Sequence, residues 1–165
     1  MRFSTKELTT CAMLAALALA LSYIEGFFPP LLPLPGVKLG LANIVTVYAL
    51  YTLGAASALS ILVVRCTLGA LFAGNASALL FSLLGGLCAM LVMIVLHRLP
   101  RLSVYGVSVG GAAAHNGGQV IAAMLTLGSA APLVYLPFLL LVSIFTGALT
   151  GFVSAMLLRA MPRIN

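Results

Sequence analysis

Residues 78–96 read ALLFSLLGGLCAMLVMIVL, a run of apolar and small residues with no charged side chain. A helix needs about 20 mainly apolar residues to cross the hydrocarbon core of a bilayer, and this run is of that order. It therefore predicts a membrane-buried helix. The whole sequence agrees, because 63% of its 165 residues are apolar and only 6% are charged. A soluble domain needs far more polar residues to cover its surface.

Five further runs of this kind lie on both sides of the first, separated by charged residues, prolines and glycines. Together they predict an all-α polytopic membrane protein, a bundle of six transmembrane helices that forms one domain over residues 1–165. No linker or low-complexity segment divides the chain. The expected spans cover residues 8–24, 39–53, 55–72, 78–96, 104–127 and 133–159.

The basic residues predict how these spans are oriented. Short cytoplasmic loops collect lysine and arginine. With a cytoplasmic N-terminus, six spans place six of the eight basic residues, and the C-terminus, on the inner side. We therefore expect a multi-pass protein of the cell membrane with both termini in the cytoplasm. The inner residues would be Arg2, Lys6, Arg98, Arg101, Arg159 and Arg163, with Lys38 in the first outer loop.

The composition also excludes several kinds of chemistry. The chain has two acidic residues, Glu7 and Glu25, and no aspartate, so paired-carboxylate catalysis and an Asp-rich magnesium site lack their side chains. The three cysteines are dispersed without a CxxC pair, which disfavours a zinc site or a disulfide framework. The net charge of +6 lies mostly at the chain ends and in one loop and forms no nucleic-acid-binding stripe. We expect no catalytic residue, metal, cofactor or nucleic-acid partner.

Arg65 is the most informative polar residue, because it falls near the middle of the third expected span. A charge at that depth is costly and normally faces a partner or a cavity. No acidic residue lies within a neighbouring span. Arg65 is then either a structural residue that caps backbone carbonyls or reaches Glu25, or a cation that meets an anionic ligand.

The fifth expected span adds His115, Asn116 and Gln119, whose spacing predicts one polar helix face. These residues are either interhelical hydrogen-bond partners or the wall of a ligand pocket. Asn43 and Lys38, near the outer start of the second span, are equally ambiguous, although a helix N-terminus there favours an anion. With the arginine of the third span, these residues predict one outward-facing cavity of positive potential.

The first outer loop, residues 26–36, is apolar, rich in proline and too irregular for a helix. A segment of this kind is either a lid over the cavity or an anchor at the membrane interface. The residues that would form the lid are Phe27, Phe28, Pro33 and Pro35.

Two stripes of small residues complete the pattern. Ala12, Ala16 and Ala20 recur every four residues in the first expected span, and Gly147 and Gly151 form a GxxxG in the sixth. Small side chains allow helix backbones to approach closely. Each stripe is either an internal packing face or, for the first, a surface where a partner subunit docks.

Two segments carry a resemblance to a known family: AMLAA over residues 12–16, and PGVKLGLAN over residues 35–43. They resemble the family described as heptaprenyl diphosphate synthase component I, also called the Gx transporter family. That family is similar in size and six-span layout to the substrate-binding S components of energy-coupling factor transporters. This resemblance implies a ligand pocket capped by the first loop. It also implies an AxxxA face, at Ala12 and Ala16, that meets a transmembrane coupling subunit.

These observations leave three hypotheses for function. The first is an S-component-like subunit that binds a small anionic or amphipathic solute for transport. Because the chain has no GxxxxGK[ST] motif, its energy would come from partner ATPases. The second is a non-catalytic membrane accessory of polyprenyl diphosphate or quinone synthesis, whose soluble synthase partner supplies the carboxylates and metal. The third is a membrane subunit of a redox assembly, for which no haem, iron–sulfur or flavin motif is visible.

Overall fold

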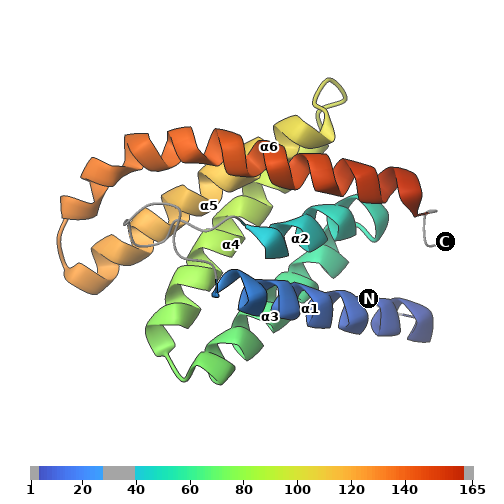
Figure 1. The fold of residues 1–165 in the computed structure, drawn as a ribbon, viewed down its shortest axis with the longest axis horizontal. Helices are drawn as coiled ribbons and strands as arrows, with labels where there is room; N and C mark the ends of the chain where they lie inside the picture. Colours follow the sequence, from blue (N-terminus) through green and yellow to red (C-terminus); the bar gives the residue numbers. More distant parts are fainter. Residues whose placement is uncertain (1–3, 28–39, 162–165) are drawn as a thin grey trace.

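The computed structural model describes residues 4–27 and 40–161 of the chain. This part forms six α-helices and one short 3-10 helix, with no strand among the described residues (Figure 1). The all-α class and the six expected helices are confirmed, with ends within about one turn of those predicted. The elements are α1 (Thr5–Glu25), α2 (Leu41–Thr52), α3 (Ala55–Ala73), α4 (Ala76–His97), α5 (Val104–Leu127), η1 (Ala131–Tyr135) and α6 (Leu136–Ala160).

Local sequence sets where several helices begin and end. Ser4 and Glu7 form a capping box at the start of α1, in which each side chain accepts a hydrogen bond from the backbone N–H of the other residue. α3 and α5 end at Gly74 and Gly128, each with a φ of 61°. Glycine adopts this left-handed conformation without strain, so it commonly terminates helices.

Length and hydropathy separate the helices into two groups. In the described part of the chain, α1, α3, α4 and the continuous segment Ala131–Ala160 are long and apolar enough to cross a membrane. α5 has 24 residues but contains glycines and polar side chains. α2 has 12 residues, which corresponds to about 18 Å against a hydrocarbon core of about 30 Å. The helix within the second expected span, 39–53, is therefore too short to cross a bilayer by itself.

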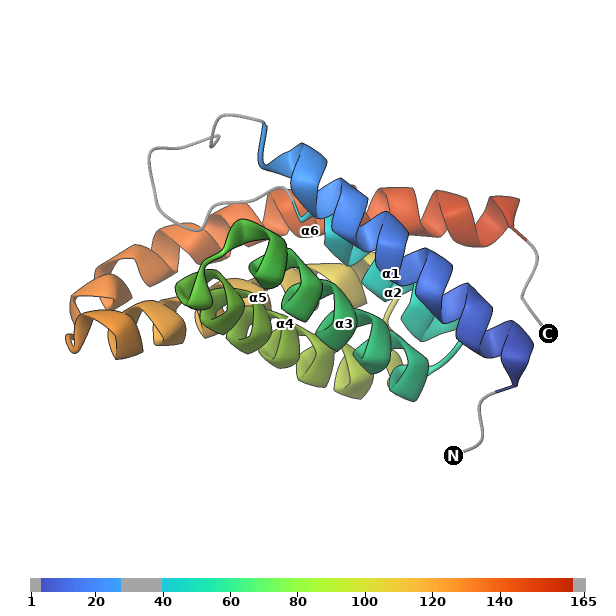
Figure 2. The ribbon, with the colours of Figure 1, turned by 90° about the horizontal axis from the view of Figure 1, so that it is seen from below.

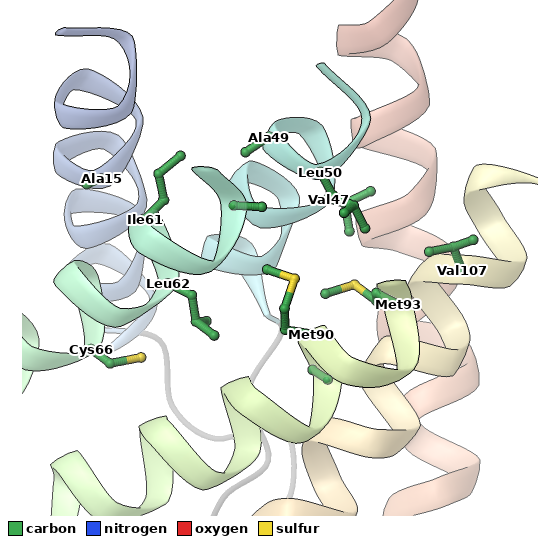
Figure 3. Packing of buried hydrophobic residues seen from close by; sticks show 12 residues of the cluster. Ala15, Val47, Ala49, Leu50, Ile61, Leu62, Cys66, Met90, Met93 and Val107 are labelled. Atoms are coloured by element: carbon green, nitrogen blue, oxygen red, sulfur yellow. The ribbon is translucent and has the colours of Figure 1, made fainter. Parts of the chain in front are cut away.

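α2 instead lies inside the bundle, where most of its side chains are buried against α1, α3 and α6. Its apolar face meets side chains of α3 and α4, and Met90 and Met93 fill the space between these helices (Figure 3). The central residues of this core are Val47, Ala49, Leu50, Ile61, Leu62, Met90 and Met93.

Two contacts show which part of the bundle α2 occupies. Its last turn reaches the end of α4, where the rings of Tyr51 and His97 have centroids 4.3 Å apart. Its first turn is hydrogen-bonded to Arg65, near the middle of α3. α2 thus fills one half of the bundle's depth, and its N-terminus lies near the middle.

Glycines allow the other helices to pack closely. A Cβ atom added at Gly118 of α5 would lie 2.6 Å from the carbonyl oxygen of Leu84 in α4, and one added at Gly147 of α6 would lie 2.5 Å from Cα of Val109 in α5. Gly151 packs against α5 in the same way. The GxxxG stripe of the sixth span is therefore an internal packing face.

The beginning of α1 and the end of α6 lie toward the same end of the bundle in two perpendicular views (Figures 1 and 2). An even number of passes through a membrane would give this arrangement. We call this end of the bundle the inner end, after the cytoplasmic side expected from the basic residues.

Candidate functional site

Arg65 on α3 reaches toward the N-terminus of α2. Its Nη2 donates a hydrogen bond to Oδ1 of Asn43, in the first turn of α2, over 3.2 Å. The Nε of Arg65 is buried and has no hydrogen-bond partner among the described residues. The guanidinium therefore retains a donor that the described part of the protein does not satisfy.

Glu25, the last residue of α1, is the acid that could neutralise Arg65. It is only 8% exposed, yet its Oε1 accepts a hydrogen bond from the backbone N–H of Gly40 over 2.6 Å. No ion pair joins Glu25 to Arg65 within the described chain. The alternative in which Arg65 reaches Glu25 is therefore wrong, because Glu25 is bonded to the Gly40 N–H and Arg65 to the Asn43 side chain.

The backbone conformation of Gly40 and its lack of a side chain allow this arrangement. It precedes α2 with a φ of 78°, which is left-handed and unfavourable for other residues. A Cβ atom added there would lie 3.3 Å from Nδ2 of Asn43. The absence of a side chain at Gly40 therefore leaves room for the Asn43 amide beside the Glu25 carboxylate.

The polar residues of α5 contact two different helices. His115 and Gln119 lie against Gly85 of α4, since a Cβ atom added at Gly85 would be 3.0 Å from Cε1 of His115 and 3.1 Å from Cγ of Gln119. Asn116 instead donates from Nδ2 to the carbonyl oxygen of Leu139 in α6 over 2.8 Å. Residues four apart share a helix face, whereas adjacent residues lie about 100° apart. The expectation of one polar face thus holds for His115 and Gln119 and not for Asn116.

Gln119 has its own unsatisfied atom. The residue is 8% exposed, and its Oε1 has no hydrogen-bond partner within the described residues. A buried polar atom without a partner is rare in proteins and calls for a specific explanation, such as a functional role or a bound water or ion. Gln119 therefore remains a candidate ligand contact.

Helix register places Arg65 and Gln119 at the same depth. On α3, the residues on both sides of Arg65 contact α4. Leu62 packs on Gly86. Sγ of Cys66 donates a hydrogen bond to the Ser82 carbonyl oxygen over 3.6 Å. Gln119 packs on Gly85, in the same turn of α4.

We call Asn43, Arg65, His115 and Gln119 the polar layer. Its members come from α2, α3 and α5 at mid-depth, beside two glycines of α4 that carry no side chain.

Tyr48 is a buried polar residue that the sequence did not single out. It is 3% exposed, and its hydroxyl group has no hydrogen-bond partner among residues 4–27 and 40–161. In the sequence it looks like one more aromatic residue of an apolar helix, so only its burial reveals it. Gly40 was also missed as a site residue, although it lies inside the segment that carries the family resemblance.

Several predicted residues lie outside the described part of the chain. These are the cation Lys38, the loop residues Phe28, Pro33 and Pro35, and the terminal residues Arg2 and Arg163. Phe27 is described, and its exposed ring stacks edge-on against Tyr23 with centroids 5.0 Å apart.

The alanine stripe of α1 faces away from the bundle. Ala12, Ala16 and Ala20 are exposed, whereas Ala15 and Ala18 are buried against α2 and α3. The stripe is therefore not an internal packing face, unlike the glycine stripe of α6.

A family comparison gives the chain its place among known proteins. The family model described as heptaprenyl diphosphate synthase component I matches residues 14–157, most of the chain and all of the polar layer. Comparisons with curated proteins and with solved structures give no match. The matched region contains every helix that positions Arg65, Asn43 and Gln119. The chain therefore belongs to the heptaprenyl diphosphate synthase component I family.

Proposed function

We propose that this protein is a non-catalytic membrane subunit that binds the diphosphate group of an isoprenoid at the polar layer. A separate, soluble synthase subunit would carry the catalytic carboxylates and metal. The family description supports this division, because a component I implies a further component. The sequence supports it too, since it contains no aspartate from which an Asp-rich magnesium site could be built.

The observation that carries this proposal is the environment of Arg65. Arg65 is half-buried, and among the described residues its guanidinium makes one hydrogen bond, to the neutral amide of Asn43, while its buried Nε has no partner. A cation held partly away from water without a counter-ion is unfavourable. An anion bound beside Arg65 would relieve this cost, and phosphate oxygens match the planar fork of guanidinium donors. An isoprenoid chain would suit the apolar surroundings.

A second candidate function is the S-component-like binding of a solute for transport. The outward-facing stripe of Ala12, Ala16 and Ala20 favours it, because a small-residue face on the outside of a bundle permits close docking of another membrane helix. The same polar layer would then hold an anionic solute, and partner ATPases would supply the energy.

Purification in mild detergent, followed by mass spectrometry of the bound proteins and small molecules, separates these functions. A soluble, Asp-rich prenyl synthase and a copurified prenyl diphosphate would support the accessory role. Recovery of a transmembrane coupling subunit with ATPases would favour transport. Recovery of redox proteins would overturn both and favour membership of a redox assembly.

Replacing Ala16 by leucine is expected to reduce partner copurification severalfold while the melting temperature in detergent stays nearly unchanged. Ala16 faces outward, so the larger side chain meets the partner and not the bundle. Ala15→Leu is the matched control. Ala15 is buried, and overpacking should lower the melting temperature by an amount that corresponds to roughly 1–3 kcal/mol. If Ala16→Leu destabilises the protein as much as Ala15→Leu, the stripe is not a partner interface.

We also expect both chain ends to be cytoplasmic, because this orientation places most basic residues inside. Leu99, between α4 and α5, and Ser129, between α5 and η1, are both exposed and suit cysteine labelling. With the three native cysteines replaced by alanine, an impermeant reagent should label Ser129→Cys in intact cells, and Leu99→Cys only after lysis. The opposite pattern would show that the orientation is inverted.

A further inference from the structure

The start of α2 is bound by two groups of opposite charge that do not touch each other. From one side, the Glu25 carboxylate accepts the N–H of Gly40 over 2.6 Å. From another, Arg65 donates to the Asn43 side chain over 3.2 Å, and the N–H of Asn43 donates to the Gly40 carbonyl over 2.8 Å. The two charges thus reach neighbouring residues at the start of α2, Glu25 through the Gly40 backbone and Arg65 through the Asn43 side chain.

Glu25 occupies a position that suits an external anion. Unpaired N–H groups and the helix dipole favour negative charge at a helix N-terminus. The carboxylate is nearly buried, although it has no cationic partner among the described residues. The other acid, Glu7, differs because it is exposed in the capping box of α1. The carboxylate oxygens of Glu25 therefore occupy a position where phosphate oxygens could accept the same hydrogen bond.

We propose that Glu25 is an internal placeholder for the ligand's phosphate group, an inference that rests on the proposed function. The arriving phosphate displaces the carboxylate from the Gly40 N–H and accepts hydrogen bonds from Gly40 and Arg65. Glu25 thereby competes with the ligand and sets its affinity. Because Glu25 ends α1, its release also frees the contact between the end of α1 and the start of α2.

Glu25→Gln tests the competition, because it keeps the shape of the side chain and removes its charge. Binding is measured with purified protein in neutral detergent, with farnesyl diphosphate and inorganic pyrophosphate as separate probes. Glu25→Gln should bind both about tenfold more tightly, since a charged hydrogen-bond acceptor no longer opposes the phosphate. Glu7→Gln, the only other neutralisation of an acidic side chain that the sequence allows, should bind like the unaltered protein.

The outcomes distinguish this inference from the proposed function. If the unaltered protein binds neither probe, both the proposed function and this inference are overturned. If it binds farnesyl diphosphate and Arg65→Gln weakens that binding while Glu25→Gln leaves it unchanged or weaker, only the placeholder role is overturned. If phosphatidylglycerol displaces farnesyl diphosphate at similar concentrations, the site takes a lipid headgroup phosphate and the isoprenoid assignment fails.

A second measurement needs no variant. A carbodiimide modifies accessible carboxyl groups, and mass spectrometry reads the peptides of Glu7 and Glu25 separately. Farnesyl diphosphate should raise the modification of Glu25 severalfold and leave that of Glu7 unchanged. Protection of Glu25 by the probe would show that the carboxylate stays in place, and would overturn the displacement.

Discussion

Replacing Gly118 by alanine is expected to destabilise the bundle by about 2–3 kcal/mol, a large effect for one methyl group. The added Cβ would lie 2.6 Å from the Leu84 carbonyl oxygen and 2.9 Å from Cα of Gly85. Both are backbone atoms of α4, so relief requires α4 and α5 to move apart. Thermal or denaturant unfolding in detergent measures the change.

Gly117 provides the matched control at the next position of the same helix. A Cβ atom added there has nothing within 4 Å. Gly117→Ala should therefore leave stability unchanged or raise it slightly, because alanine favours a helix by up to about 1 kcal/mol over glycine. Equal melting of the two variants would contradict the close α4–α5 packing.

Replacing Arg65 by glutamine is expected to weaken the binding of farnesyl diphosphate by about 10- to 100-fold, the range for a lost hydrogen bond between charged groups. The folded protein should lose little stability, since the variant removes a partly buried charge that forms no ion pair among the described residues. Binding by calorimetry and melting in detergent together give both quantities.

Two further variants sharpen this result. Arg65→Lys keeps the charge but loses the planar fork of donors, so its binding should fall between the unaltered protein and Arg65→Gln. Arg98→Gln removes an exposed arginine next to α4 and should bind normally. If Arg65→Gln binds the probe normally but fails to fold, Arg65 has a structural role through Asn43.

The helices and their boundaries follow from the sequence because their causes are local. Apolar runs between glycines, prolines and charges are long enough to form spans, and Ser4, Gly74 and Gly128 fix individual helix ends. The sequence also identifies Arg65 as exceptional, because a charged residue inside an apolar run stands out without any knowledge of its tertiary contacts. The segments AMLAA and PGVKLGLAN also carried the family resemblance without any structure.

The sequence by itself therefore determined an all-α membrane protein of six helices, its family, and the polar residues that lie at depth. Only the tertiary structure decided which way these residues point. Asn116 contacts α6, whereas Gln119 contacts α4. Ala16 is exposed, whereas Gly147 packs inside the bundle. Glu25 accepts a hydrogen bond from Gly40 and forms no ion pair with Arg65 among the described residues. The physical reason is that helix periodicity fixes the angles between residues of one helix. The direction of each face depends on neighbouring helices from distant parts of the chain.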